Sequence, residues 1–286
     1  MKDISVNAIS LRTSRREIAI GERTLIMGVI NATPDSFSDG GLFQSSAEAI
    51  EQGLRMAEEG ADFIDIGGES TRPGSDQVSL AEELKRVIPI VRGLSAKISI
   101  PISVDTMKAQ VAREALDAGA EIINDITSLH NDPAMAQTIA AYRAAVVLMH
   151  MRGTPKVMQK GDLSYGSVPG DMISFLHERM EKAQSAGINK DRIIVDPGIG
   201  FGKTAVDNMR LIRYLEDFKK LGSPILVGVS RKSFIGYITG GAPQERVEGT
   251  AAAVTAAVLN GADIVRVHDV SFMKKVVMMA DAIRRA

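Results

Sequence analysis

The sequence predicts an α/β protein built as a single (β/α)8 TIM barrel, with a short N-terminal β-hairpin ahead of it. The main observation is a pattern of Gly, Ala and an acidic residue followed by apolar residues, which recurs at 60–66, 119–125 and 261–267. In each copy a helical pattern ends at the glycine, which readily adopts the left-handed conformation that closes a helix. The apolar run that follows is typical of a strand buried on both faces.

Looser copies of the same unit raise the number of alternating strand and helix patterns to eight. Alternation of this kind over a whole chain is the signature of a (β/α)8 barrel. A doubly wound open sheet is the alternative fold, but it does not need a regular eighth unit.

Each element is expected where the hydrophobic period changes. Residues 1–20 alternate around Ser14-Arg15-Arg16 and form the hairpin, which would close the bottom of the barrel, and residues 21–286 form the barrel as one domain. Apolar runs rich in Val and Ile predict strands at 24–30, 62–66, 100–104, 121–125, 145–149, 193–196, 224–229 and 263–267. Helical periodicity predicts helices at 45–59, 79–93, 106–118, 132–144, 171–186, 207–221, 245–260 and 271–285. Two helix starts fit capping boxes, Ser45 with Glu48 and Ser79 with Glu82.

Composition narrows the class of protein. In 286 residues there are 34 Lys and Arg against 35 Asp and Glu, a net charge of −1, so no overall basic field points to a nucleic acid or a membrane. The chain has no cysteine, which excludes disulfides, thiolate nucleophiles and cysteine zinc sites, and its 4 histidines show no metal-ligand spacing. No apolar run reaches the 18 residues of a membrane span, so we expect a cytoplasmic protein.

Polar residues follow every predicted strand, at the barrel face where (β/α)8 enzymes place their chemistry. A single Asp or Asn at a strand end is often only a helix cap. Capping alone does not explain eight such ends in succession, with acids after strands 3, 4 and 6 and cations after strands 7 and 8. These strand-end residues include Asn31, Arg72, Asp105, Asn124, Asp125, His150, Asp196, Lys232, Arg266 and His268.

This division of charge has a chemical meaning. Buried Asp and Asn side chains pair with the ring N–H, amino and carbonyl groups of a flat heterocycle. Arg, Lys and His beside them suit a phosphorylated group on the same ligand. We therefore expect a polar heterocycle that carries a phosphate or pyrophosphate, with the loops 31–41 and 67–75 as lids over the site.

At these residues the sequence resembles the dihydropteroate synthase family, the folate-pathway enzymes targeted by sulfonamides. The resemblance runs from about residue 25 to about residue 270 and includes eight motifs in order. They are Asn31–Gly41, Asp65–Ser75, Ser103–Thr106, Ile123–Ile126, Met149–Pro155, Val195–Lys203, Gly228–Ser233 and Arg266–Val270.

The resemblance implies a reaction in which 6-hydroxymethyl-7,8-dihydropterin pyrophosphate and p-aminobenzoate give 7,8-dihydropteroate and pyrophosphate, with Mg²⁺ as cofactor. It also implies a homodimer. The implied pterin-binding residues are Asp105, Asn124, Met149, Asp196, Phe201, Gly228 and Lys232. The implied pyrophosphate-binding residues are Asn31, Thr71, Arg72, Arg266 and His268, with Asn31 also serving the metal. The p-aminobenzoate-binding residues would be Phe37, Pro73, Phe201, Lys232 and Ser233.

The resemblance also implies a dissociative displacement of pyrophosphate, with catalytic roles for Asp35, Asp105, Lys232 and Arg266. Two alternatives remain. A pterin-binding methyltransferase that uses methyltetrahydrofolate and a corrinoid protein would share the acidic pocket, but its substrate carries no pyrophosphate for Arg72, Arg266 and His268 to bind. A non-catalytic pterin-binding module would bind the ligand without turnover.

Overall fold

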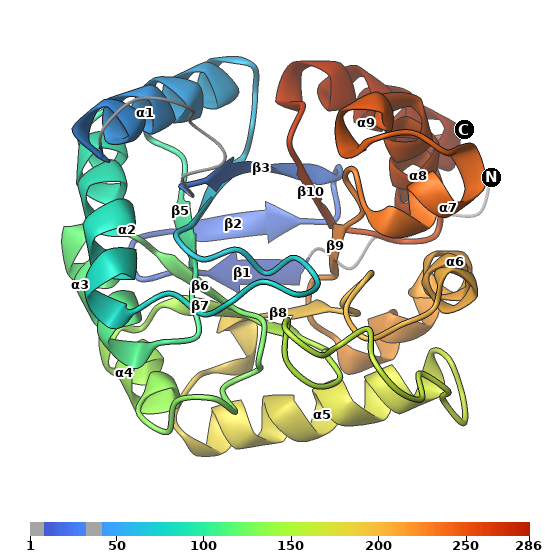
Figure 1. Cartoon of the computed structure of the whole chain (residues 1–286), viewed down its shortest axis with the longest axis horizontal. Helices are drawn as coiled ribbons and strands as arrows, with labels where there is room; N and C mark the ends of the chain where they lie inside the picture. The colour runs from blue at the N-terminus through green and yellow to red at the C-terminus, as the bar shows by residue number, and fades with distance from the viewer. Residues whose placement is uncertain (1–8, 33–41) are drawn as a thin grey trace.

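The computed structural model of this chain describes residues 9–32 and 42–286 (Figure 1). Eight parallel strands form one sheet in the order β8-β7-β6-β5-β4-β3-β10-β9. A parallel bridge between Val195 and Ile225 joins β8 to β9, so the sheet closes on itself and the predicted barrel is confirmed. The strands are β3 Leu25–Asn31, β4 Phe63–Gly67, β5 Ile102–Asp105, β6 Ile122–Asp125, β7 Ala145–Met149, β8 Ile193–Asp196, β9 Leu226–Gly228 and β10 Ile264–Val267.

Helices surround the strands as an outer ring (Figure 1). Their bounds are α1 Leu42–Glu58, α2 Leu80–Ser95, α3 Ala109–Ala118, α4 Met135–Tyr142, α5 Gly170–Ser185, α6 Ala205–Arg213, α7 Ser233–Thr239, α8 Val247–Leu259 and α9 Val270–Arg285. Short 3-10 helices lie at Lys190–Arg192, Leu215–Leu221 and Pro243–Glu245. None of the helices within residues 9–32 and 42–286 is long and apolar enough to cross a bilayer.

Three details of the expected helices are wrong. The helix expected at 207–221 stops at Arg213 and continues as a 3-10 helix, which buries Leu215, Phe218 and Leu221. The sequence also did not indicate α7, a seven-residue helix between β9 and α8. The helix α1 begins three residues before Ser45, which therefore lies inside the helix and not at its N-cap.

The second expected capping box forms only in part. The Ser79 side chain accepts a hydrogen bond from the Glu82 N–H at 3.3 Å, as an N-cap should. The Glu82 carboxylate does not return to Ser79 and binds the Arg86 guanidinium at 2.9 Å. A complete box occurs instead at α6, between Thr204 and Asp207.

The predicted N-terminal hairpin is present and covers the bottom of the barrel. Strand β1 Ile9–Arg12 pairs antiparallel with β2 Glu17–Ile20 across a turn centred on Ser14 and Arg15. Leu11 and Ile20 are fully buried against the inward-facing residues at the strand starts, among them Phe63. Leu11 and Ile20 of the hairpin therefore contribute to the apolar core inside the barrel.

Replacing Ile20 by Val should lower the free energy of unfolding by about 0.5–1.5 kcal/mol, because one buried methylene is lost in a packed core. Ile18→Val removes the same group from a half-buried position of the same strand and should cost less. Urea denaturation of both variants measures this difference. Equal stability of the parent and Ile20→Val would mean that the hairpin frays from the barrel.

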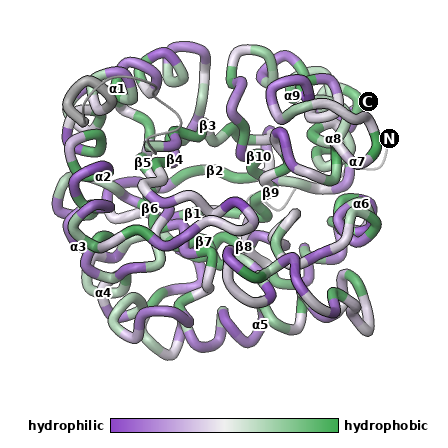
Figure 2. The backbone as a smooth tube through the Cα atoms, in the orientation of Figure 1, coloured by the Kyte–Doolittle hydropathy of each residue, from purple (hydrophilic) through white to green (hydrophobic). Residues whose placement is uncertain are grey.

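The barrel interior changes from apolar to polar along the strand direction. Inward-facing positions alternate along each strand, so β4 presents Phe63, then Asp65, then Gly67 to the inside. The first layer is apolar, and the polar residues occupy the carboxyl ends. Figure 2 shows hydrophobic colour gathered on strands such as β3 and β7, while the surrounding helices alternate. Along β4 the polar inward-facing residue therefore lies toward the carboxyl end of the strand, at the barrel mouth.

Candidate active site

The strand register brings the predicted site residues to one level of the barrel mouth. Gly67 pairs with Asn31 on one side and with Asp105 on the other, and Asp105 pairs with Asn124. On the opposite wall Met149 pairs with Asp196, and Gly228 pairs with Arg266. Residues that are far apart in the sequence are therefore neighbours because the strands are parallel and in register.

Arg266 holds two carboxylates together in the middle of this mouth. Its Nε donates to Asp65 Oδ2 at 2.7 Å, and its Nη2 donates to Asp105 Oδ2 at 3.3 Å. Asn124 Nδ2 donates to the same Asp65 oxygen at 3.1 Å. Asp65 is fully buried, and its second oxygen has no hydrogen-bond partner within the described part of the chain. Asp65 therefore orients both the predicted pterin-binding amide and the predicted anion-binding arginine.

Burial and the neighbouring charges together set the charge states of Asp105 and Arg266. Burial raises the pKa of Asp105 to about 8, although Arg266 beside it acts in the opposite direction. Burial also works to lower the pKa of Arg266, but Asp65 and Asp105 overcome it and the pKa is raised. The guanidinium thus stays charged, whereas Asp105 is easily protonated while no ligand occupies the site.

This shift predicts how stability depends on pH. An aspartate in the unfolded chain ionises near its ordinary pKa of 3.8, whereas Asp105 in the folded chain keeps its proton up to about pH 8. Between these values the folded state binds more protons, so its stability falls as pH rises. Asp105→Asn removes this contribution, and the ligand-free variant should lose less stability than the parent between about pH 5 and about pH 8. Denaturant titrations at the two pH values test this, and equal losses would contradict it.

Asp196 and Lys232 form the other side of the mouth. Asp196 Oδ1 accepts the Gly198 N–H at 2.6 Å, and burial raises the pKa of this carboxyl against the attraction of Lys232. The Lys232 ammonium lies 4.6 Å from the centre of the Phe201 ring and donates to the Ile199 carbonyl. Burial lowers the pKa of Lys232 to about 8.

Between Lys232 and Arg266 the barrel wall carries no side chain, because the residue there is Gly228. A Cβ built on Gly228 would lie 3.8 Å from Lys232 Nζ and 3.8 Å from Arg266 Cβ. The absence of a side chain there leaves room between the two cations for a flat ligand. Met149, on β7, is buried in a small apolar cluster, against which Phe201 packs.

A buried lysine that we did not single out organises the glycine-rich turn after β8. Lys203 is 2% exposed, and its Nζ lies 2.9 Å from His150 Nδ1. It also donates to the carbonyls of Gly198 at 2.8 Å and Phe201 at 3.0 Å. Gly198 itself has φ +69°, and a Cβ there would collide with the His150 carbonyl at 1.9 Å. Lys203 therefore fixes the turn that carries Phe201.

The predicted anion-binding residues lie on the strands and loops around Arg266. His268 follows β10, and its Nδ1 is 2.9 Å from Ser230 Oγ. Arg72 is exposed in the loop after β4, which also carries Thr71 and Pro73, and it is one of the cations that lower the pKa of His268. Ser233 is exposed at the first residue of α7, directly after Lys232. Asp35 and Phe37, from the expected lid, lie outside the described residues.

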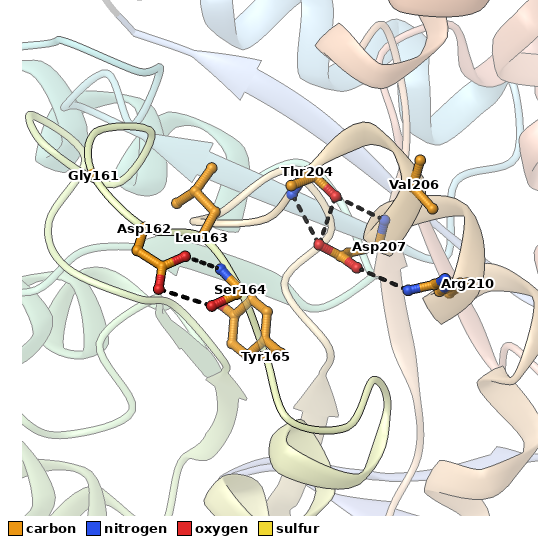
Figure 3. Close-up of a pocket in the computed structure, with 9 residues that line it drawn as sticks. All are labelled: Gly161, Asp162, Leu163, Ser164, Tyr165, Thr204, Val206, Asp207 and Arg210. Atoms are coloured by element: carbon orange, nitrogen blue, oxygen red, sulfur yellow. Dashed lines mark hydrogen bonds and ion pairs between the residues drawn. The ribbon is translucent and has the colours of Figure 1, made fainter.

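A separate hollow of about 550 Å³ lies between the loop after β7 and the start of α6 (Figure 3). Its polar groups already bind one another, since Asp162 accepts from Ser164, and Asp207 accepts from Thr204 and pairs with Arg210. None of the predicted site residues in the described part of the chain lines it. We therefore assign the site to the barrel mouth.

The sequence did not predict a role in the site for two residues of the mouth, Asp65 and Lys203. Asp65 carried a usable signal, because an acidic residue inside a strand buried on both faces needs a buried partner. Lys203 carried none, since a lysine in a glycine-rich loop is usually solvated.

A (β/α)8 barrel whose mouth combines buried carboxylates, an amide and a central arginine defines an enzyme that binds a polar heterocycle. The family model described as pterin binding enzyme matches residues 27–268. A dihydropteroate synthase from Synechocystis is 50% identical over 266 residues, 93% of this chain and 92% of the relative. The chain belongs to the pterin-binding enzyme family, and within it to the dihydropteroate synthases, which are transferases of folate biosynthesis.

Solved structures agree with this assignment. The Xanthomonas albilineans dihydropteroate synthase with 4-aminobenzoic acid has a TM-score of 0.91 and 43% identity, covering 98% of this chain and 99% of that one. The Yersinia pestis dihydropteroate synthase in a sulfonamide drug complex also has a TM-score of 0.91, with 41% identity, 97% of this chain and 100% of that chain covered. The expected family and fold are thus confirmed.

Proposed function

We propose that this transferase joins 6-hydroxymethyl-7,8-dihydropterin pyrophosphate to p-aminobenzoate, giving 7,8-dihydropteroate and pyrophosphate. The observation that carries the proposal is the position of Arg266, whose guanidinium contacts Asp65 and Asp105 at the centre of the mouth. Arg266 therefore lies between the buried hydrogen-bond acceptors and the loops that we expect to bind the anion. A substrate with a donor-bearing ring at one end and a pyrophosphate at the other fits both halves. The Xanthomonas relative solved with 4-aminobenzoic acid supports the second substrate.

The pterin ring would occupy the acceptor-rich half. Asp105, Asn124 and Asp196 are buried, sit at strand ends and offer acceptors and an amide to the ring edge. Met149 and Phe201 would contact the ring faces, while the bare backbone of Gly228 admits the flat ring beside Lys232.

The pyrophosphate would bind between Arg266, His268 and the loop residues Thr71 and Arg72. Two of the five guanidinium N–H donors of Arg266 bind carboxylates, which leaves others for an anion. The p-aminobenzoate would lie above the pterin, with Phe37 and Pro73 over its ring, Phe201 and Lys232 beside it and Ser233 at its carboxylate.

Magnesium fits this site as an ion held chiefly by substrate. No cluster of three His, Asp or Glu that could hold a metal occurs in residues 9–32 and 42–286. Mg²⁺ keeps several waters and is commonly held by one or two protein ligands plus phosphate oxygens. Asn31, at the end of β3, would supply a side-chain oxygen to the ion at the mouth. When bound, the ion would neutralise charge on the leaving pyrophosphate.

The proposed mechanism is a dissociative displacement. The bond between the pterin methylene carbon and the pyrophosphate oxygen breaks first, and its electron pair leaves with pyrophosphate, which Arg266 and Arg72 stabilise. The electron-rich ring spreads the resulting positive charge, which Asp105 and, from the expected lid, Asp35 offset. The amine nitrogen then forms the new C–N bond, and its proton is lost to water.

We further propose that the enzyme is a cytoplasmic homodimer, as in the family that the sequence resembles. Helices α8 and α9 present an apolar outer face that suits a second copy of the chain. Leu259 on α8 and Phe272 and Met279 on α9 are each more than two-fifths exposed. A molar mass of two chains in solution would support the dimer, and a mass of one chain would contradict it.

Pyrophosphate release tests the proposed reaction. With the dihydropterin pyrophosphate and Mg²⁺ present, release should require p-aminobenzoate, and 7,8-dihydropteroate should form in equal amount. Pterin binding without release would favour a non-catalytic module. Methyl transfer from methyltetrahydrofolate to a corrinoid protein, without this release, would favour the methyltransferase.

A further inference from the structure

Ser230 and His268 lie side by side at the barrel mouth. Strands β9 and β10 are paired in parallel with Gly228 opposite Arg266, so Ser230 and His268, two residues further on, come level with each other. Ser230 Oγ lies 2.9 Å from His268 Nδ1 and also accepts the His268 backbone N–H at 3.3 Å. One hydroxyl therefore contacts the same histidine twice.

The protons available in this contact indicate which tautomer the His268 imidazole adopts. A serine hydroxyl has one proton to donate and two lone pairs. The backbone N–H of His268 uses a lone pair, and Ser230 is 7% exposed, so its proton needs an acceptor inside the protein. Within the described residues the acceptor that this hydroxyl reaches is His268 Nδ1. Nδ1 therefore accepts, and a neutral ring then carries its proton on Nε2.

The surroundings also favour a neutral ring. Burial, with Arg266 and Arg231 next in effect, lowers the pKa of His268 to about 4. Asp269, a carboxylate that acts to raise this pKa, is engaged by the Arg231 guanidinium at 2.6 Å. The anion side thus holds charged guanidinium groups and an uncharged imidazole.

We propose that Ser230 is a positioning residue that holds His268 as the neutral Nε2–H tautomer, so that His268 donates an uncharged hydrogen bond to the departing pyrophosphate. The proposal rests on the proposed function, which places the pyrophosphate beside His268. His268 then orients the pyrophosphate through a directed hydrogen bond, whereas Arg266 and Arg72 supply the positive charge that attracts it. An imidazole without a second proton cannot act as a general acid toward the leaving group near neutral pH.

The tautomer can be read directly. The chain has 4 histidines, so ¹⁵N spectra of the imidazole rings are simple, and His268→Gln assigns the signal of interest. At pH 7 the ligand-free protein should show His268 as Nε2–H, and inorganic pyrophosphate with Mg²⁺ should shift the Nε2 signal. Ser230→Ala should allow the Nδ1–H form to appear and weaken pyrophosphate binding about two- to tenfold, the value of one hydrogen bond. Ser230→Thr keeps the hydroxyl and should restore both.

Three results would overturn the proposal. The first is an imidazolium or an Nδ1–H tautomer at His268 in the parent protein. The second is an unchanged tautomer in Ser230→Ala. The third is an Nε2 chemical shift of His268 that does not change at saturating pyrophosphate. A purely structural role for Ser230 would lower the melting temperature without changing the tautomer. Pyrophosphate release by the parent, measured separately, shows whether only this inference has failed or the proposed function as well.

Discussion

Arg266→Ala should lower kcat about 10²- to 10³-fold, because it removes the donor proposed to stabilise charge on the departing pyrophosphate. It should also lower the free energy of unfolding by about 3–5 kcal/mol, since breaking a buried ion pair leaves a charge without compensation. That charge is on Asp65, which is fully buried and, among residues 9–32 and 42–286, would keep only the Asn124 amide as a partner. Steady-state kinetics and urea denaturation measure the two effects.

A double variant separates catalysis from stability at this position. Adding Asp65→Asn to Arg266→Ala removes the uncompensated carboxylate, so stability should largely return while turnover stays low. Arg266→Lys keeps a positive charge without the forked geometry and should be intermediate in turnover. If Arg266→Ala raised only the KM for p-aminobenzoate and left kcat unchanged, the role proposed for Arg266 would be wrong.

Asp196→Asn should weaken pterin binding by about 1–3 kcal/mol while the fold survives, because a buried acceptor becomes a donor that faces ring donors. The asparagine oxygen can still accept the Gly198 N–H, which Asp196 Oδ1 accepts at 2.6 Å. The second oxygen, which makes no hydrogen bond within residues 9–32 and 42–286, becomes the NH₂ group presented to the ligand.

Asp207→Asn provides the matched control for this substitution. Asp207 closes the capping box at the start of α6, and asparagine also accepts there. Calorimetry should therefore find pterin affinity lowered in Asp196→Asn and unchanged in Asp207→Asn. Unchanged affinity in a folded Asp196→Asn protein would remove Asp196 from the site.

Most of the fold was predictable because its repeat is local. The Gly-Ala-acid pattern placed the bounds of β4, β6 and β10 to within one residue, since a helix-ending glycine and a buried apolar run are both visible in the sequence. The break after Arg213 was not predictable, because neither Gly nor Pro marks it and burial of Phe218 depends on tertiary packing. Helix α7 is too short, at seven residues, to show a period.

The sequence predicted which strand-end residues form the site, but it did not predict which of them touch one another. Asp105, Asn124 and Arg266 were expected because each lies at or next to the carboxyl end of a strand, and parallel register makes strand ends neighbours. The contact between Arg266 and Asp65, residues 201 positions apart, could not be predicted without the register. The same holds for Lys203, whose burial follows from the turn around it.

The dissociative step is tested most directly by the secondary deuterium isotope effect at the pterin methylene carbon, measured where the chemical step limits the rate. The proposed binding mode puts guanidinium groups beside the leaving group and carboxylates beside the ring, so the carbon should flatten before the amine attacks. The account predicts a clearly normal effect, with the deuterated substrate reacting more slowly. A value close to unity would contradict it and would favour concerted attack by the amine.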